Sequence, residues 1–237
     1  AQKIAVPISS YGVWDRGGGV DDYSDPKADF VMGIEVSATW AEVQSKGPGI
    51  FDFSQFQEVL NTAAKYHKIV KISINVGPNS PLWLYDNGVP LVKVISKKPE
   101  KHDKKFGNYP YYINENHKKY FFELIKQFSI FLRSQPKEKF DCIAFVQVKT
   151  GATGDEEPYK GEPADEKFAI AKKDWEEYRI AVFELYKKYF NDVSDRQIVL
   201  TFNNVDPVKH TVAYNWVMNT IDPKIGFGIK GGAYNRG

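Results

Sequence analysis

The chain has 237 residues, 42% of them hydrophobic and 26% charged, which suits one globular α/β domain over 1–237 with a sizeable core. Its 32 basic and 30 acidic residues give a net charge of +2, which is too balanced to indicate binding of nucleic acid or of an anionic membrane. The single cysteine, Cys142, cannot form an internal disulfide, so cysteine use leaves the cellular compartment open.

Apolar, β-rich runs alternate with helical patterns along the chain. The strands predicted from the apolar runs are 3–9, 30–40, 68–76, 140–149, 197–204 and 225–232. Helices are predicted within 50–67, over about 114–134 and at 212–221, and one helix or a pair of helices is predicted over about 164–190. In the first of these, Ser54-Gln55-Phe56-Gln57 matches the pattern of a capping box at a helix start.

The alternation of strands and helices predicts parallel βαβ units. Several predicted strands end in polar or Gly-rich residues, as in a (β/α)8 TIM barrel, which carries its active site at the carboxyl ends of its strands. A Rossmann sheet is the alternative, but no predicted strand is followed by a GxGxxG turn. Because about six βα units are predicted where a closed barrel needs eight, we expect a fragment, whose last two units come from missing C-terminal sequence or from another chain.

The sequence lacks the motifs of several common enzyme classes. It contains no GxxxxGK[ST], GxSxG, HExxH or CxxC motif, so neither a metal nor a cofactor is expected. Cys142 lies within a predicted strand and is interpreted as a buried structural thiol. The histidines stand in Lys-rich surroundings and are predicted to be solvated surface residues: His67, His102, His117 and His210.

The segment GATGDEEPYKG, residues 151–161, places Asp155, Glu156 and Glu157 directly behind a predicted strand. Hydrolysis of a glycosidic bond needs one carboxylic acid to protonate the leaving oxygen and a second carboxylate as nucleophile or base. Three crowded carboxylates raise one another's pKa, which is what a general acid requires. The alternative interpretation is a solvated charge run that ends at Pro158.

A longer stretch carries a family resemblance. Residues 33–90 run through a strand, Trp40, the helix entry GIFDFS, the next strand, PLWL and the turn GVP. This layout resembles clan A glycoside hydrolases of the agarase and β-galactosidase type, which are TIM barrels. In these families the fourth strand ends with the acid/base Glu and the seventh with the nucleophile Glu.

The resemblance implies roles for the acidic segment. Strand 140–149 is the fourth in our count, so the predicted acid/base is Glu156, with Asp155 second and Glu157 third. Such families usually show Asn-Glu or Gly-Glu here, and this chain departs from them with Gly154-Asp155-Glu156. No nucleophile is predicted, because it would lie on a seventh strand beyond Gly237.

The ends of the predicted strands supply candidates for substrate binding. Trp40 and Trp83 either stack on sugar faces or pack in the core. The side chains of four asparagines suit sugar hydroxyls: Asn75, Asn79, Asn203 and Asn204. Two cations, Lys149 and Lys230, suit an anionic group such as a sulfate or uronate. Further candidates are Glu157, Tyr159 and Tyr234, together with the predicted loop Trp14-Asp15-Arg16, whereas Glu35 is interpreted as a structural group.

The sequence therefore predicts a retaining glycoside hydrolase that acts on a polysaccharide or its oligosaccharides. The alternatives are a non-catalytic carbohydrate-binding barrel and a barrel isomerase or aldolase with a Schiff-base lysine at Lys149 or Lys230. The partner is expected to be carbohydrate, not nucleic acid or membrane, since no apolar run reaches transmembrane length. The first residues, Ala-Gln-Lys, fit either the chain left after signal cleavage or an artificial start, and we expect a secreted or periplasmic protein.

Overall fold

The computed structural model describes residues 12–16, 21–95, 108–152, 157–203, 205, 207–208, 211–222 and 225–230. A six-stranded parallel sheet runs in the order β1-β2-β3-β6-β8-β9, so its strands lie side by side in chain order. They are β1 (Val13–Asp15), β2 (Val31–Thr39), β3 (Ile69–Asn75), β6 (Ile143–Gln147), β8 (Leu200–Asn203) and β9 (Phe227–Lys230). A small antiparallel sheet, β5-β4-β7, contains β4 (Leu91–Ile95), β5 (Asn108–Pro110) and β7 (Glu162–Pro163).

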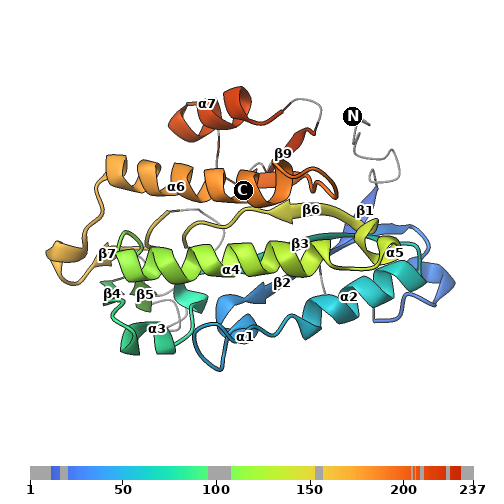
Figure 1. Ribbon diagram of the computed structural model, residues 1–237, viewed down its shortest axis with the longest axis horizontal. Coiled ribbons are helices and arrows are strands. Elements are labelled where there is room, and N and C mark those ends of the chain that lie inside the picture. The colour runs from blue at the N-terminus through green and yellow to red at the C-terminus, as the bar shows by residue number, and fades with distance from the viewer. Residues whose placement is uncertain are drawn as a thin grey trace.

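Helices connect most of the parallel strands. Right-handed crossovers between strands that follow in order place their helices on one face of a sheet, and Figure 1 shows α2, α4 and α6 in front of the strands. The α-helices are α1 (Trp40–Val43), α2 (Ser54–Lys65), α3 (Trp83–Asp86), α4 (Glu115–Arg133), α5 (Lys137–Phe140), α6 (Lys172–Tyr186) and α7 (Thr211–Thr220). Shorter 3-10 turns cover Pro26–Ala28, Gly77–Asn79 and Glu166–Phe168, and a π-helical turn, Lys187–Asn191, extends α6. Among the described residues, no helix is both long and apolar enough to cross a membrane.

The sequence pattern of α4 shows why the helical layer holds to the sheet. Asn114 caps the helix by accepting a hydrogen bond from the backbone N–H of His117. Apolar residues then recur every three or four positions, and all of the predicted ones are buried: Phe121, Leu124, Ile125, Phe128 and Leu132. Phe128 packs on Phe56 of α2, with 5.3 Å between ring centroids, so neighbouring helices share one aromatic core.

The two faces of the six-stranded sheet differ because side chains alternate along each strand. On β3, Val70, Ile72 and Ile74 are buried in the core beneath the helices. We call the opposite side the concave face, because the parallel strands curl into a half-barrel whose hollow side it forms. The protein is therefore α/β, and its described strands make up a partial (β/α)8 barrel. The source of the remaining barrel stays a prediction.

Most predicted elements are present with shifted ends. Five of the six predicted strands correspond to β2, β3, β6, β8 and β9, and the predicted helices correspond to α2, α4, α6 and α7. The predicted strand 3–9 lies outside the described residues. The loop predicted around Trp14 was wrong, because Val13–Asp15 forms β1, whose Trp14 ring packs onto Gly33 of β2. A Cβ at Gly33 would lie 2.4 Å from that ring, so the absence of a side chain makes the pairing possible.

Two local predictions also need correction. Ser54 is the first residue of α2, and the residue before it makes no side-chain capping bond, so the predicted capping box is absent. A complete capping box occurs instead at α1, where Thr39 and Glu42 cap each other's backbone N–H groups. The small sheet was missed altogether, because β4, β5 and β7 are short and occupy segments that read as loops.

Candidate functional site

The register of the sheet brings the predicted strand-end residues together in one line. Thr39 of β2 pairs with Asn75 of β3, and Asn203 of β8 pairs with Lys230 of β9. Between them, Gln147 pairs with Thr201, and the N–H of Val148 donates to the Thr201 carbonyl, so Lys149 comes level with Asn203. We call this line the outer row: Thr39, Asn75, Lys149, Asn203 and Lys230. It crosses the carboxyl ends of the strands, where a barrel carries its site.

The part of the outer row between β6 and β8 is rich in buried cations. Lys149 is 7% exposed and Asn203 is 6% exposed. Arg179 of α6, itself buried, donates from its guanidinium to the Asn203 carbonyl at 3.0 Å. Buried cations attract anionic groups strongly, because little water screens them. Two buried cations, Lys149 and Arg179, therefore lie close to this end of the sheet.

The base of the acidic segment stands directly behind β6. The N–H of Ala152 donates to the Glu157 carbonyl at 2.7 Å, which brings together the residues that flank 153–156. Gly151 lies under Trp175, where an added Cβ would come within 2.6 Å of the indole ring and within 2.5 Å of the Glu157 carbonyl oxygen. Asp155 and Glu156 lie outside the described residues, and the Glu157 side chain is exposed. Both flanks of the predicted acid/base are thus fixed at the carboxyl end of the fourth strand.

The segment after the acidic residues is also anchored. Tyr159 is buried, donates its hydroxyl to the Phe168 carbonyl at 3.1 Å, and packs against the rings of Tyr109 and Tyr112. Beyond it, β7 pairs with β4 of the small sheet. Tyr159 therefore packs at the base of the loop. Its ring is buried, so it offers no exposed face for the predicted contact with substrate.

The two candidate tryptophans have different surroundings. Trp40 is fully buried, and its indole N–H donates to the Gln44 side chain at 2.8 Å. The structure thus decides for the core role that the sequence left open for Trp40, because a ring packed on all sides cannot stack on a sugar. Trp83 is partly exposed and donates to the Gln44 carbonyl at 2.6 Å, so its stacking role stays a prediction.

The remaining predicted residues are placed in part. Asn75 and Asn79 are half-buried at and just beyond the end of β3. Lys230 belongs to β9, but only its backbone is described. Asn204 and Tyr234 lie outside the described residues.

An ion network lies lower on the concave face. Glu35 of β2 accepts from the Lys71 ammonium at 2.9 Å and pairs with the Arg16 guanidinium at 3.4 Å. Arg16 follows β1 directly, so the predicted loop contributes to this face as an extension of a strand. The structural role expected of Glu35 fits a carboxylate held between two cations.

A second line of polar residues was missed by the sequence reasoning. The same register places Ser37 of β2 beside Ser73 of β3, and Gln147 of β6 beside Thr201 of β8, one step inside the outer row. We call these residues the inner row: Ser37, Ser73, Gln147 and Thr201. Gln147 interrupts the apolar run IAFVQV, and that interruption was the signal that could have revealed the row.

The histidine prediction was wrong for His117, which is buried in α4 against Trp40 and Tyr112. Burial lowers the pKa of His117 to about 3, so the ring is neutral, and its Nδ1 lies 3.1 Å from the Tyr112 carbonyl. His67 is exposed as predicted, and His102 and His210 lie outside the described residues. Among the described residues, no group of three His, Cys, Asp or Glu side chains could hold a metal ion.

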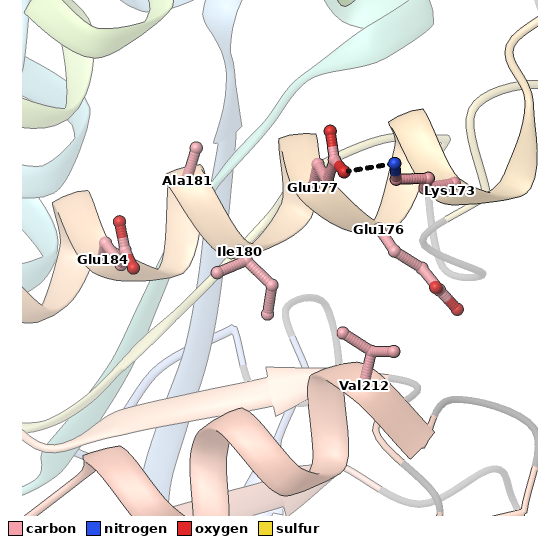
Figure 2. Close-up of a pocket in the computed structure, with 7 residues that line it drawn as sticks. All are labelled: Lys173, Glu176, Glu177, Ile180, Ala181, Glu184 and Val212. Carbon is pink, nitrogen blue, oxygen red and sulfur yellow. Dashed lines mark ion pairs between the residues drawn. The ribbon is translucent and has the colours of Figure 1, made fainter.

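A pocket of about 390 Å³ lies between α6 and α7 (Figure 2). Ile180, Ala181 and Val212 are its apolar residues, and its polar residues come from α6. One of them, Glu177, pairs with Lys173 at 3.6 Å. None of the predicted site residues lines this pocket, which belongs to the helical layer and not to the concave face.

Solved structures of other proteins were compared with this fold. The catalytic domain of a β-amylase from Paenibacillus polymyxa superposes with a TM-score of 0.59 at 13% identity, covering 92% of this chain and 75% of that one. A GH5_18 protein from Bifidobacterium longum subsp. infantis gives a TM-score of 0.47 at 10% identity, with 85% and 45% covered. Endo-glycoceramidase II from Rhodococcus sp. gives 0.41 at 13% identity, with 77% and 44% covered.

The β-amylase likeness shows that the chain shares the fold of a glycoside hydrolase, and at this identity it shows the fold alone. No protein-family model matches the sequence, and no curated protein matches it.

Proposed function

We propose that this chain is a retaining glycoside hydrolase that acts on a polysaccharide or its oligosaccharides. The observation that carries the proposal is where the acidic segment begins and ends, because Ala152 and Glu157, which flank residues 153–156, are hydrogen-bonded directly behind β6. Its base is fixed behind β6, beside an outer row of polar and cationic side chains at the carboxyl ends of a half-barrel. The β-amylase domain that shares this fold supports the assignment to hydrolysis of glycosidic bonds.

In the proposed mechanism Glu156 is the general acid. Its carboxyl group donates a proton to the glycosidic oxygen as the bond to the anomeric carbon breaks, and a second carboxylate forms a bond to that carbon. Glu156, now ionised, then takes a proton from the water that releases the sugar. The neighbouring carboxylates Asp155 and Glu157 favour the protonated form of Glu156 before the first step.

The second carboxylate is expected on a seventh strand, which is not among the six described. Asn75, Lys149 and Asn203 of the outer row are proposed to bind substrate hydroxyls or an anionic substituent. The layout of residues 33–90 supports a relationship to the agarase and β-galactosidase type, and a protein of this kind would be secreted or periplasmic.

The test is a set of matched carboxylate variants. Glu156→Gln should lower kcat about a hundred- to ten-thousandfold, because it removes the transferable proton and keeps the shape of the side chain. Asp155→Asn and Glu157→Gln are the controls in the same segment and should have smaller effects. Initial rates on maltotetraose, cellotetraose, laminaritetraose and galactotetraose would be compared, with circular dichroism to verify folding.

Wild-type turnover in Glu156→Gln would contradict the acid/base assignment. For whichever oligosaccharide is cleaved, proton NMR of the first product should show the anomer of the substrate, as double displacement requires. Binding of an oligosaccharide without any cleavage would instead identify a carbohydrate-binding barrel.

A further inference from the structure

Two buried polar atoms of the inner row lack a partner among the described residues. Gln147 is 1% exposed and Thr201 is 9% exposed. The side-chain Nε2 of Gln147 and the Oγ1 of Thr201 are shielded from solvent and make no hydrogen bond within the part of the chain that the structure describes. A buried polar group without a partner destabilises the folded protein, so each such group calls for an explanation.

The two residues lie next to each other on the concave face. Gln147 of β6 pairs in register with Thr201 of β8, and paired residues of parallel strands point to the same side of the sheet. That side is opposite the helices, because the neighbours of the two residues, Val146, Leu200 and Phe202, belong to the core. The two residues therefore lie side by side, with their backbones roughly 5 Å apart.

Their position along the strands relates them to the candidate site. Gln147 stands two residues before Lys149, and Thr201 two residues before Asn203, so the pair lies about 7 Å below the outer row. This places them one layer deeper in the half-barrel than the residues proposed to bind substrate.

The local packing holds the pair in place. A Cβ on Gly228 of β9 would lie 2.8 Å from the Cγ2 of Thr201, so the Thr201 methyl group occupies the space that the glycine leaves. Gln147 is flanked along β6 by Val146 and Val148, which are fully buried under the helices. Side chains held in this way lose little further entropy when they bind a ligand.

We propose that Gln147 and Thr201 form a subsite for a hydroxyl group of a carbohydrate ligand, a role that rests on the proposed function. The amide Nε2 can only donate a hydrogen bond, whereas the threonine hydroxyl both donates and accepts. A sugar hydroxyl accepts from the amide and donates to the threonine with one oxygen, so it satisfies both atoms. A cation would be repelled by the amide hydrogens, and an apolar group would leave both atoms unsatisfied.

This subsite has a signature that a purely structural pair does not share. Replacing an unsatisfied buried polar group by an apolar one of the same shape should stabilise the protein without ligand, and it should weaken the binding of the ligand. Thr201→Val and Gln147→Met make these replacements. Gln135→Met is the matched control, because Gln135 is also a buried glutamine with an unsatisfied amide oxygen, and it lies between α4 and α5, before the start of β6.

The experiment measures both properties on the full chain. Thermal unfolding without ligand should show Tm raised by about 2–4 °C in Thr201→Val. Calorimetric titration in a Glu156→Gln background, with the oligosaccharide cleaved fastest among the four named above, should show Kd raised about three- to tenfold by Thr201→Val and by Gln147→Met. Gln135→Met should leave Kd unchanged.

Unchanged Kd in Thr201→Val and Gln147→Met would overturn the subsite and indicate an ordered water instead. A lower Tm without ligand in both variants would also overturn it, because the atoms would then have partners within the protein. Failure of the proposed function is a separate result: the wild type would cleave none of the oligosaccharides, and this is seen before any inner-row variant is made.

Discussion

Along β3 the residues alternate between two environments, and the contrast extends across the whole sheet. Ile72 and Ile74 are fully or almost fully buried under the helices. Lys71 and Ser73, their neighbours in sequence, lie on the concave face, where Lys71 joins an ion network and Ser73 belongs to the inner row. The interior of a closed barrel of this type is usually dominated by branched apolar residues. On this concave face the outer and inner rows are polar instead.

The difference indicates that the two faces have separate tasks. The helix-facing side excludes water and supplies the free energy of folding through apolar burial. The concave side keeps polar atoms that contribute little to stability and includes two without partners among the described residues, Gln147 Nε2 and Thr201 Oγ1. Cavity-forming substitutions on the first face should therefore cause the largest losses of stability, whereas substitutions in the inner row should change recognition.

The largest expected effect is a loss of stability on substitution of a residue on the helix-facing side. Ile72→Ala should lower the free energy of unfolding by about 2–5 kcal/mol, because it leaves a cavity in a packed core. Ser37→Ala, on the concave face of the neighbouring strand and exposed, should change it by less than about 0.5 kcal/mol. Urea denaturation of both variants measures the difference, and equal losses would show that the two faces contribute alike.

A smaller effect concerns the buried histidine of the helical layer. The pKa of His117 is about 3 in the folded protein and about 6.5 in the unfolded chain, so between these values the unfolded chain binds the extra proton. The stability from a neutral His117 is complete above pH 6.5 and is lost as the pH falls toward 3. From pH 7 to pH 5 the loss should be about 2 kcal/mol.

His117→Gln is neutral at every pH and tests this directly. Urea denaturation at pH 7 and pH 5 should show a smaller loss of stability in the variant than in the wild type. The loss of stability that remains in the variant comes from protonation of carboxylates, which both proteins share. An identical pH dependence in the two proteins would mean that His117 is accessible to protons in the folded state.

The smallest expected effects distinguish the two cations in the ion network of the concave face. Lys71→Met should cost about 1–2 kcal/mol, because the Lys71 and Glu35 side chains are only 12% and 22% exposed. Arg16→Gln should cost less than about 0.5 kcal/mol, since the Arg16 side chain is 73% exposed and water screens its charge. Urea denaturation of both variants in low and in high salt measures the two costs, because salt weakens the exposed ion pair more than the buried one. A larger cost for Arg16→Gln than for Lys71→Met would show that the exposed pair contributes more to stability.

Local patterns predicted the elements whose periodicity is long and regular. The helix that became α4 was located to within about a residue, because its apolar positions repeat over five turns and Asn114 caps its start. Short segments failed for the opposite reason. Three residues of β1 and two of β7 carry too little pattern to recognise, and their pairing depends on distant partners such as Gly33 and β4.

The candidate site was predictable in part. The polar strand ends at Asn75, Lys149 and Asn203 pointed to the carboxyl side of the sheet before any register was known. The burial of Trp40 was not predictable, since an aromatic ring after a strand suits the core and a sugar platform equally. The inner row was also hidden, because a polar residue within an apolar strand has meaning only once its neighbours on the adjacent strands are known.

By itself, the sequence determined the α/β class, the chain order of the parallel strands and the position of the acidic segment behind the fourth of them, because these depend on local periodicity and on βαβ connection. Only the tertiary structure decided which side chains share a row, that Gln147 stands beside Thr201, and that His117 is enclosed. Register and enclosure arise from contacts between residues far apart in the chain, and a linear pattern does not record them.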